Sequence, residues 1–301
     1  MSFSFNFEDP NSSSTPVEKA PSSESERHEN EKISVKTAVE VTEFYEDEIV
    51  NKLEITKMDF NNSMLKVIDT KNIEQTVLND PDLNKLLQSS NVLEAVCTQS
   101  DLVSGTYEGG LKIWECAIDL TEFLNSCLND PSMKISNKSV LEVGCGAGLP
   151  GLFCLKNGAK CVHFQDFNEE VLKLLTRNNV KLSFEDGVSN ESEACRYFSG
   201  DWSSFTDLAC KENLKYEVIL TAETIYNEEN YGKLHTLFEK LLSKNGFVLV
   251  AAKSYYFGVG GNVEAFLEYV CSKKIFTSEK VHTVSKGVTR CIILMQRTQE
   301  K

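Results

Sequence analysis

Several hallmarks of common protein classes are missing from this chain of 301 residues. Its ten cysteines include no C-x-x-C pair, and its four histidines lie far apart, without a further ligand at the spacing that a metal site needs. We therefore expect no metal site and no disulfide framework. The cysteines instead fit the reduced thiols of a cytoplasmic or nuclear protein.

The sequence also lacks long apolar runs. The longest of them, such as residues 247–252, have the length of a buried strand and are too short to span a bilayer. The first residues, Met-Ser-Phe-Ser-Phe-Asn-Phe, do not combine a basic region with an apolar one, so we expect no secretory signal. These absences predict no membrane contact and a location in the cytoplasm, with the nucleus left open.

Positive charge is scarce, because 31 Lys and Arg residues stand against 45 Asp and Glu residues, which gives a formal net charge of -14. Proteins that hold RNA or DNA through phosphates present a basic face, so direct nucleic-acid binding is not expected. A basic protein is an electrostatically better partner. We expect the chain to act as a monomer on such a protein.

Composition divides the chain into three regions. Residues 1–35 are mainly Ser, Glu, Pro and Asn with no apolar period, which predicts a disordered acidic tail. In residues 36–100 the apolar residues form only small clusters, which is typical of an accessory region with short helices. Residues 101–301 have the pattern of one large domain.

Strand and helix patterns alternate within that domain. Apolar residues at helical spacing predict a helix over about 113–124, and β-rich runs predict strands at 140–143, 162–164, 196–198, 218–221 and 247–252. Helices are expected after most of these strands, which indicates an α/β fold with a mostly parallel sheet. Two last β runs, 276–284 and 288–295, predict a hairpin and hence one antiparallel strand.

The most informative motif is Ser139-Val-Leu-Glu-Val-Gly-Cys-Gly-Ala-Gly148. A short strand carries Glu142 and passes at once into three glycines, so the backbone can approach a ligand closely before a helix begins. Asp166 ends the next strand, where an acidic side chain accepts hydrogen bonds from the ribose hydroxyls of an adenosine ligand. A helix cap is the alternative role for Asp166, although Asn168 fits that role better.

The third and fourth strands also end in polar residues. Gly200-Asp201-Trp202 follows the third strand, and its indole could stack on an adenine base. A helix start at Asp201 is an equally good interpretation. Glu223 leaves a strongly apolar strand at the same edge of the sheet, where a carboxylate would be poorly solvated. We favour a role in catalysis or substrate orientation for Glu223 over a helix cap.

The glycine run separates two kinds of adenosine cofactor. Nicotinamide enzymes use G-x-G-x-x-G to face a helix N-terminus toward a pyrophosphate, and here no glycine stands three residues after Gly146. Glu142 would also repel a pyrophosphate. It suits a ligand that carries an ammonium group and a sulfonium, as S-adenosylmethionine (S-adenosyl-L-methionine) does.

At these residues the chain resembles the seven-stranded S-adenosylmethionine-dependent methyltransferases. More narrowly, Tyr107-Glu-Gly-Gly-Leu-Lys-Ile-Trp-Glu-Cys116, Thr221-Ala-Glu-Thr-Ile-Tyr-Asn227 and Tyr256-Phe-Gly-Val-Gly-Gly261 are similar to segments of the histidine protein methyltransferase 1 homologues. The resemblance implies a seven-stranded Rossmann-like methyltransferase sheet, mostly parallel with one antiparallel strand, behind a partly disordered N-terminal region.

The same resemblance implies a set of residues around S-adenosylmethionine. These candidates are Ile113, Trp114, Glu115, Cys116, Ala117, Glu142, Gly144, Gly146, Gln165, Asp166, Phe167, Gly200, Asp201, Trp202 and Ala222. The family usually has Ser where this chain has Ala222, so only a backbone contact is expected there. Some relatives carry a basic stretch where residues 185–193 are acidic, which puts nuclear import by that route in doubt.

The activity that the resemblance implies is that of a protein-L-histidine N-methyltransferase. It would transfer a methyl group from S-adenosylmethionine to an imidazole nitrogen of a histidine in a large-subunit ribosomal protein. One group must accept the N–H of the other ring nitrogen, and Glu223 is our candidate, with Tyr226 as the second catalytic residue. The substrate-binding candidates lie in a glycine-rich loop on the same rim and are Tyr255, Tyr256, Phe257 and Gly258.

Three alternatives stay open at this point. A protein-lysine N-methyltransferase of the same fold would have to deprotonate an ammonium, so its activity should climb at alkaline pH. A catalytically silent binding module could keep the cofactor fold to hold a partner, and Ala222 slightly favours this reading. A nicotinamide dehydrogenase is the least favoured of the three.

Overall fold

The computed structural model describes residues 35–299, except 46–47, 49–50, 62, 89, 91, 99 and 185–193. Nearly all of the predicted disordered tail 1–35 and the whole acidic stretch 185–193 therefore lie outside the described residues. In the part of the chain that is described, no helix is both long and apolar enough to cross a membrane.

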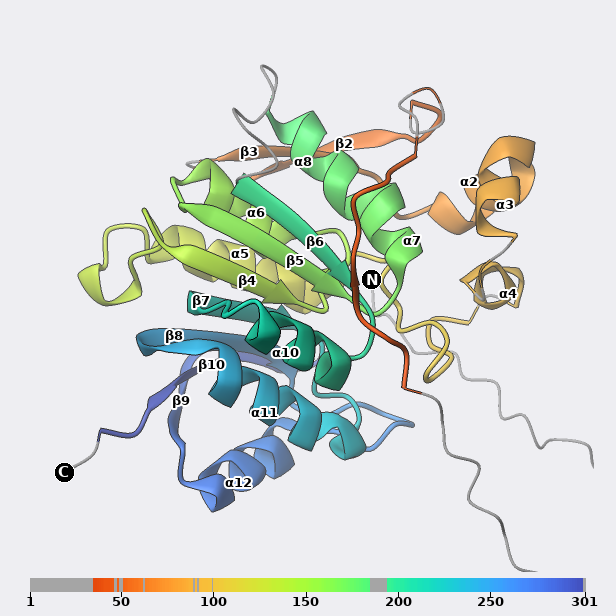
Figure 1. Cartoon of the computed structure of the whole chain (residues 1–301). Helices are drawn as coiled ribbons and strands as arrows, with labels where there is room; N and C mark the ends of the chain where they lie inside the picture. Colours follow the sequence, from red (N-terminus) through yellow and green to blue (C-terminus); the bar gives the residue numbers. More distant parts are fainter. Residues whose placement is uncertain are drawn as a thin grey trace, which may run out of the picture.

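An eight-stranded sheet forms the centre of the molecule, in the order β1-β6-β5-β4-β7-β8-β10-β9 (Figure 1). The strands from β4 to β8 run parallel, whereas β10 is antiparallel to both β8 and β9. The bounds are Val39–Glu40 (β1), Ser139–Val143 (β4), Cys161–Asp166 (β5), Cys195–Ser199 (β6), Tyr216–Ala222 (β7), Leu242–Lys253 (β8), Phe276–Val284 (β9) and Arg290–Arg297 (β10). The predicted fold class is confirmed.

Helices cover both faces of this sheet, because successive residues of each buried strand point to opposite sides. On β4, Val140 packs into one core with α5 and α6, while Leu141 and Val143 pack into a second core with α10, α11 and α12. The bounds are Glu115–Ser126 (α5), Leu149–Lys156 (α6), Trp202–Lys211 (α10), Tyr231–Leu241 (α11) and Val263–Lys273 (α12), with short 3-10 turns at Pro131–Met133 (η1) and Glu228–Asn230 (η3).

A long helical stretch follows β5. It consists of α7 (Glu169–Val171), a π-helical segment (Leu172–Thr176, η2) and α8 (Arg177–Ser183). Its apolar side chains form a third core with the region before residue 100 and with Tyr107 and Leu111. That core ties the loop ahead of α5 to the domain.

The region 36–100 packs on this framework. β2 (Ile55–Asp59) and β3 (Met64–Ile68) form a separate hairpin beside α8, where the amide of Ile68 donates to Asn179 Oδ1 at 2.8 Å. Three short helices follow, namely α2 (Ile73–Asn79), α3 (Pro81–Leu87) and α4 (Val92–Cys97). The division into regions 36–100 and 101–301 stays a prediction.

β1 is an addition that the sequence did not predict. It pairs antiparallel with β6, through Val39 opposite Ser199 and Glu40 opposite Phe198, and so places part of the accessory region in the main sheet. Two exposed residues have no periodicity that a sequence pattern could show. The strand exists because the edge of β6 offers it backbone partners.

Candidate functional site

A cavity of about 360 Å³ lies at the carboxyl edge of the central strands, a size that suits a small-molecule ligand. Most of the predicted site residues line it, and they come from five segments of the chain. These residues are Ile113, Trp114, Ala117, Glu142, Gly144, Gly146, Asp166, Phe167, Asp201, Trp202, Ala222, Glu223 and Tyr226. The predicted residues outside the lining are Glu115, Cys116, Gln165, Gly200, Tyr255, Tyr256, Phe257 and Gly258.

The glycine loop after β4 forms one wall of the cavity. Gly144, Gly146 and Gly148 have φ angles of 61°, 50° and 75°, which L side chains rarely adopt. A Cβ atom on Gly144 would lie 2.7 Å from the Thr224 side chain. The loop can follow this path only because these residues lack side chains.

Glu142 lies behind that loop, and its side chain is almost fully buried. One carboxylate oxygen accepts the backbone N–H of Gly151 at 2.8 Å. Burial raises the pKa of Glu142 to about 8, despite this hydrogen bond. Glu142 is therefore mainly protonated at neutral pH unless a cation lies beside it.

Asp166 reaches the cavity from the end of β5. Its Oδ2 accepts the Gly146 N–H at 2.9 Å and its Oδ1 accepts the Asn168 N–H at 3.0 Å. Burial raises the pKa of Asp166 to about 6, and these two hydrogen bonds oppose the shift. Asn168 is the N-cap residue of α7, but its side chain makes no capping hydrogen bond. It instead donates to Thr106 O at 2.8 Å and accepts from Glu108 N at 3.2 Å.

Gln165 orders the walls of the cavity from outside its lining. Its amide nitrogen donates to Gly200 O at 2.9 Å, and its Oε1 accepts the indole N–H of Trp202 at 3.0 Å. Asp201 caps α10 through the Ser203 N–H at 2.8 Å while it also lines the cavity. The helix start at Asp201 is confirmed, and its place beside an adenine stays a prediction.

The loop 101–114 closes the cavity from the opposite side. The Trp114 indole donates to Gly109 O at 2.9 Å, and the Tyr226 hydroxyl donates to Oε2 of Glu108. The other Glu108 oxygen accepts the Gly105 N–H at 2.6 Å. Sequence reasoning missed Glu108, although it lies within the Tyr107–Cys116 motif, because its partner Tyr226 is 118 residues away.

Glu223 follows β7 directly, with a φ of 60° that is unusual for a residue other than glycine. Such backbone strain is concentrated at functional sites. The side chain is about nine-tenths buried, and the Cys116 thiol and the Tyr256 hydroxyl lie against its carboxylate. Its ion-pair partner is Lys253, whose Nζ lies 3.3 Å from Oε1.

The loop after β8 holds the predicted substrate-binding residues. Tyr256 is buried behind Glu223, and burial and then the Glu223 charge raise the pKa of Tyr256 well above its usual range. Tyr255 and Phe257 are exposed, with ring centroids 5.0 Å apart. Gly258 adopts a φ of 85° beside them. The loop is joined to the cavity wall by the Gly261 N–H, which donates to Tyr226 O at 2.8 Å.

No group of three or more His, Cys, Asp or Glu side chains is placed to hold a metal ion in the described part of the chain. All ten cysteines lie within that part, and each is a free thiol.

Comparisons with known proteins agree with this geometry. Residues 99–267 match the model of a protein family described as lysine methyltransferase. A histidine protein methyltransferase 1 homologue of Bos taurus is 42% identical over 225 residues, which are 68% of this chain and 59% of that protein. The homologue of Rattus norvegicus is 36% identical over 256 residues, which are 78% of this chain and 70% of that protein.

One solved structure shows the shared fold. A protein of Streptococcus mutans, provisionally assigned as a SAM-dependent methyltransferase, has a TM-score of 0.52 at 12% identity, over 80% of this chain and 55% of that one. The chain spans 59% and 70% of the length of the two curated relatives. Because the family model matches more than half of the chain and the match to the rat protein extends over two thirds of that protein, the chain belongs to the methyltransferase family of the histidine protein methyltransferase 1 homologues.

Proposed function

We propose that the chain is a protein-histidine N-methyltransferase that uses S-adenosylmethionine. The cavity suits this cofactor because its glycine wall has no side chains, so the backbone can lie close to a ligand. Its two ends also carry different kinds of side chain. Phe167, Trp202 and Asp166 suit an adenosine, with aromatic faces for the base and a carboxylate for the ribose. We assign Trp114 and Glu142, which also line the cavity, to the methionine end.

When bound, S-adenosylmethionine supplies an electrophilic methyl group on a positively charged sulfur. The chain's own residues then have to hold the acceptor nitrogen in line with that methyl group and keep water away. Glu108 and Tyr226, which join the loop 101–114 to the segment after β7, close the cavity for this purpose. They do so without using the Glu223 carboxylate.

Glu223 is the residue that we expect to select histidine as the methyl acceptor. Glu223 lines the cavity, and its carboxylate can accept the N–H of one imidazole nitrogen there. The other imidazole nitrogen then keeps its lone pair toward the methyl group. The same carboxylate stabilises the imidazolium that forms, since it bears the opposite charge. Neutral imidazole is the main form of histidine near pH 7, so no proton has to be removed first.

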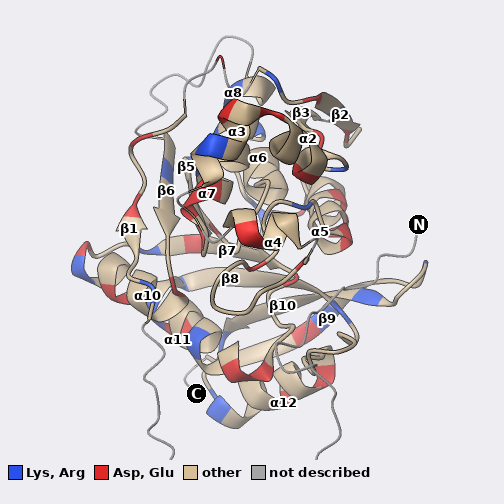
Figure 2. Cartoon of the chain, turned by 90° about the vertical axis from the view of Figure 1, so that its right-hand side faces the viewer, with Lys and Arg blue, Asp and Glu red and all other residues tan. Residues whose placement is uncertain are grey.

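A basic protein substrate, such as a large-subunit ribosomal protein, suits the electrostatics of the cavity. Seven of its lining residues are acidic and three are basic. Further acidic residues, coloured red in Figure 2, lie on α4 and α7. Within this proposal the chain works as a monomer in the cytoplasm.

The experiment that tests this function locates the transferred methyl group. The protein is incubated with isotopically labelled S-adenosylmethionine and cell extract, and the modified side chain is identified by mass spectrometry. Label on histidine supports the proposal. Label on lysine alone would favour the alternative of a protein-lysine methyltransferase. Tight cofactor binding without any label would favour a catalytically silent binding module.

Replacement of the proposed acceptor carboxylate provides a second test. Glu223→Gln keeps the size of the side chain but removes its negative charge, so turnover on histidine should fall by about 10²–10⁴-fold. The affinity for S-adenosylhomocysteine, measured by calorimetry, should change little. A variant that retains full turnover would show that another group accepts the imidazole N–H.

A further inference from the structure

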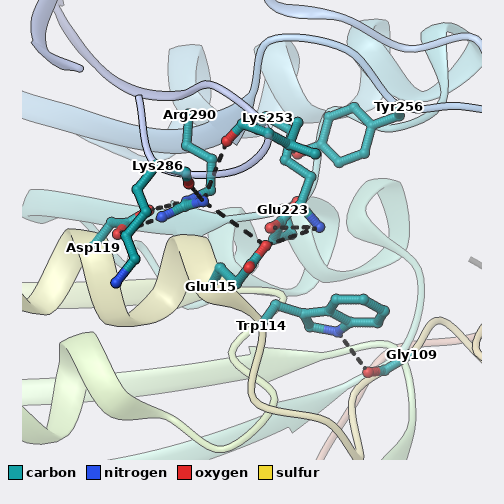
Figure 3. A network of polar contacts seen from close by, with 10 residues as sticks. Gly109, Trp114, Glu115, Asp119, Glu223, Lys253, Tyr256, Lys286 and Arg290 are labelled. Carbon is teal, nitrogen blue, oxygen red and sulfur yellow. Dashed lines mark hydrogen bonds and ion pairs between the residues drawn. The ribbon is translucent and has the colours of Figure 1, made fainter. Parts of the chain in front are cut away.

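A network of charged side chains surrounds Glu223 (Figure 3). Lys253, on β8, is only 5% exposed, and its Nζ lies 3.3 Å from Glu223 and 3.8 Å from Glu115. The same ammonium group lies 5.2 Å from the centroid of the Trp114 ring, which lines the cavity. Lys253 is therefore a buried basic side chain directly behind two residues of the cavity wall, Trp114 and Glu223.

The second basic side chain of this network already pairs with another carboxylate. Arg290, on β10, binds both carboxylate oxygens of Asp119 and the backbone oxygens of Lys286 and Val288. It approaches Glu115 only at 3.9 Å. Among the described residues, Lys253 is accordingly the basic side chain that balances the charge of Glu223.

We propose that Lys253 is a specificity-determining residue, which takes the cation position beside Glu223 and so makes the site accept a neutral imidazole but reject a lysine ammonium. This inference rests on the proposed histidine methyltransferase function. Lys253 pairs with Oε1 of Glu223, and Glu223 lines the cavity, where its carboxylate can meet an imidazole N–H.

The discrimination lies in the charge with which each acceptor arrives. A lysine side chain enters as a cation and needs a carboxylate both to bind and to lose its proton, whereas histidine near pH 7 enters mainly neutral. Two ammonium groups that share one buried carboxylate repel each other strongly at short range. Specificity of this kind comes from a repulsive element built against the wrong substrate.

The groups that face Glu223 come from several elements. Lys253 and the buried Tyr256 approach from β8 and the loop after it, while Glu115 and Cys116 approach from the first turn of α5. Burial and then the Glu223 charge raise the pKa of the Cys116 thiol well above its usual range. Lys253 is therefore the basic neighbour of Glu223, and its removal takes one positive charge out of the pocket.

The test compares the products of the wild-type protein with those of Lys253→Gln. Each protein is incubated with labelled S-adenosylmethionine and cell extract, the extract is hydrolysed, and labelled methyllysine and methylhistidine are quantified by mass spectrometry. Lys253→Gln should raise the ratio of methyllysine to methylhistidine by at least about tenfold. Lys253→Arg, which keeps the positive charge, should retain the wild-type ratio.

Lys138→Gln is a matched control. Substitution of Lys138 also removes an ion pair, with Glu217 at 2.7 Å. However, Lys138 directly precedes β4 and therefore lies at the amino ends of the strands, away from the cavity. This control should keep the wild-type ratio. An unchanged ratio in a Lys253→Gln variant that still binds S-adenosylhomocysteine would overturn the inference.

A competition measurement covers the case in which Lys253→Gln does not fold. With the wild-type protein, 4-methylimidazole should suppress labelling of histidine, while n-butylamine at the same concentration should not. Equal suppression by both compounds would contradict the inference. If the wild-type protein places no label on histidine at all, the proposed function itself fails, which separates the two outcomes.

Discussion

Glu142 shows how a single residue can report on the cofactor. Its side chain has no basic neighbour in the cavity wall that lowers its pKa, and burial raises that pKa to about 8. A bound ammonium group would favour the ionised carboxylate, because opposite charges attract most strongly in a buried site. The pH dependence of cofactor binding therefore tests where the methionine end lies.

Between pH 6.5 and 7.5, the affinity for S-adenosylmethionine should rise with pH. Glu142 must lose a proton to pair with the ammonium group, so below a pKa of about 8 each pH unit should increase the affinity by up to about tenfold. Calorimetry in two buffers of different ionisation enthalpy should also detect proton release on binding. Glu142→Gln should abolish both effects, and an affinity independent of pH in the wild-type protein would contradict this placement.

At the scale of elements, the cavity is closed by a contact between two loops rather than by a rigid strand. The loop 101–114 meets the segment after β7 where the Tyr226 hydroxyl donates to Glu108. The Glu108 backbone is held in turn by Asn168, which follows β5. Three chain segments thus depend on one another for closure of the cavity.

Tyr226→Phe should therefore weaken closure more than it affects chemistry. Loss of a hydrogen bond to a charged group costs about 1.5–3 kcal/mol, so the Kd for S-adenosylhomocysteine should rise by about 10–100-fold. The rate of a single turnover at saturating cofactor should change much less. If the single-turnover rate falls while the Kd stays constant, Tyr226 acts on the acceptor and not on the loop.

The edge strand β1 supplies another element of the cavity. Lys36, just before it, lines the cavity, its backbone oxygen accepts the Asp201 N–H at 3.0 Å, and its ammonium lies 4.7 Å from the centroid of the Phe167 ring. Gly200 makes room for this segment, because a Cβ atom there would lie 2.6 Å from Ala38 Cα. The approach of the two backbones is possible only with glycine.

Gly200→Ala should displace the segment around β1 and lower the affinity for S-adenosylhomocysteine by about tenfold or more. Gly260→Ala is a matched control, since Gly260 also has a positive φ of 91° but no atom lies within 4 Å of its Cβ position. Because only Gly200→Ala introduces a steric clash, the control measures the effect of the backbone strain alone. Equal affinities of the two variants would show that β1 does not shape the cofactor site.

At the scale of the whole molecule, the sequence predicted what repeats along the chain and missed what depends on distant contacts. The alternation of strands and helices, the glycine loop and the acids at strand ends follow local patterns, and the fold that they predict is confirmed. Glu108, Lys253 and β1 have no local signature. Their roles arise only when Tyr226, Glu223 and β6 are brought beside them.

The net charge of -14 belongs to the same scale, and it predicts how ionic strength should affect turnover. If the substrate is a basic protein, long-range attraction assists its approach, and salt screens this attraction over about 10 Å at 0.1 M ionic strength. Raising the salt concentration from 0.05 to about 0.3 M should therefore increase KM several-fold. The kcat should stay nearly constant, because the Glu223 site is buried and little screened. Steady-state kinetics on the substrate found by labelling checks this, and a KM independent of salt would argue against a basic substrate.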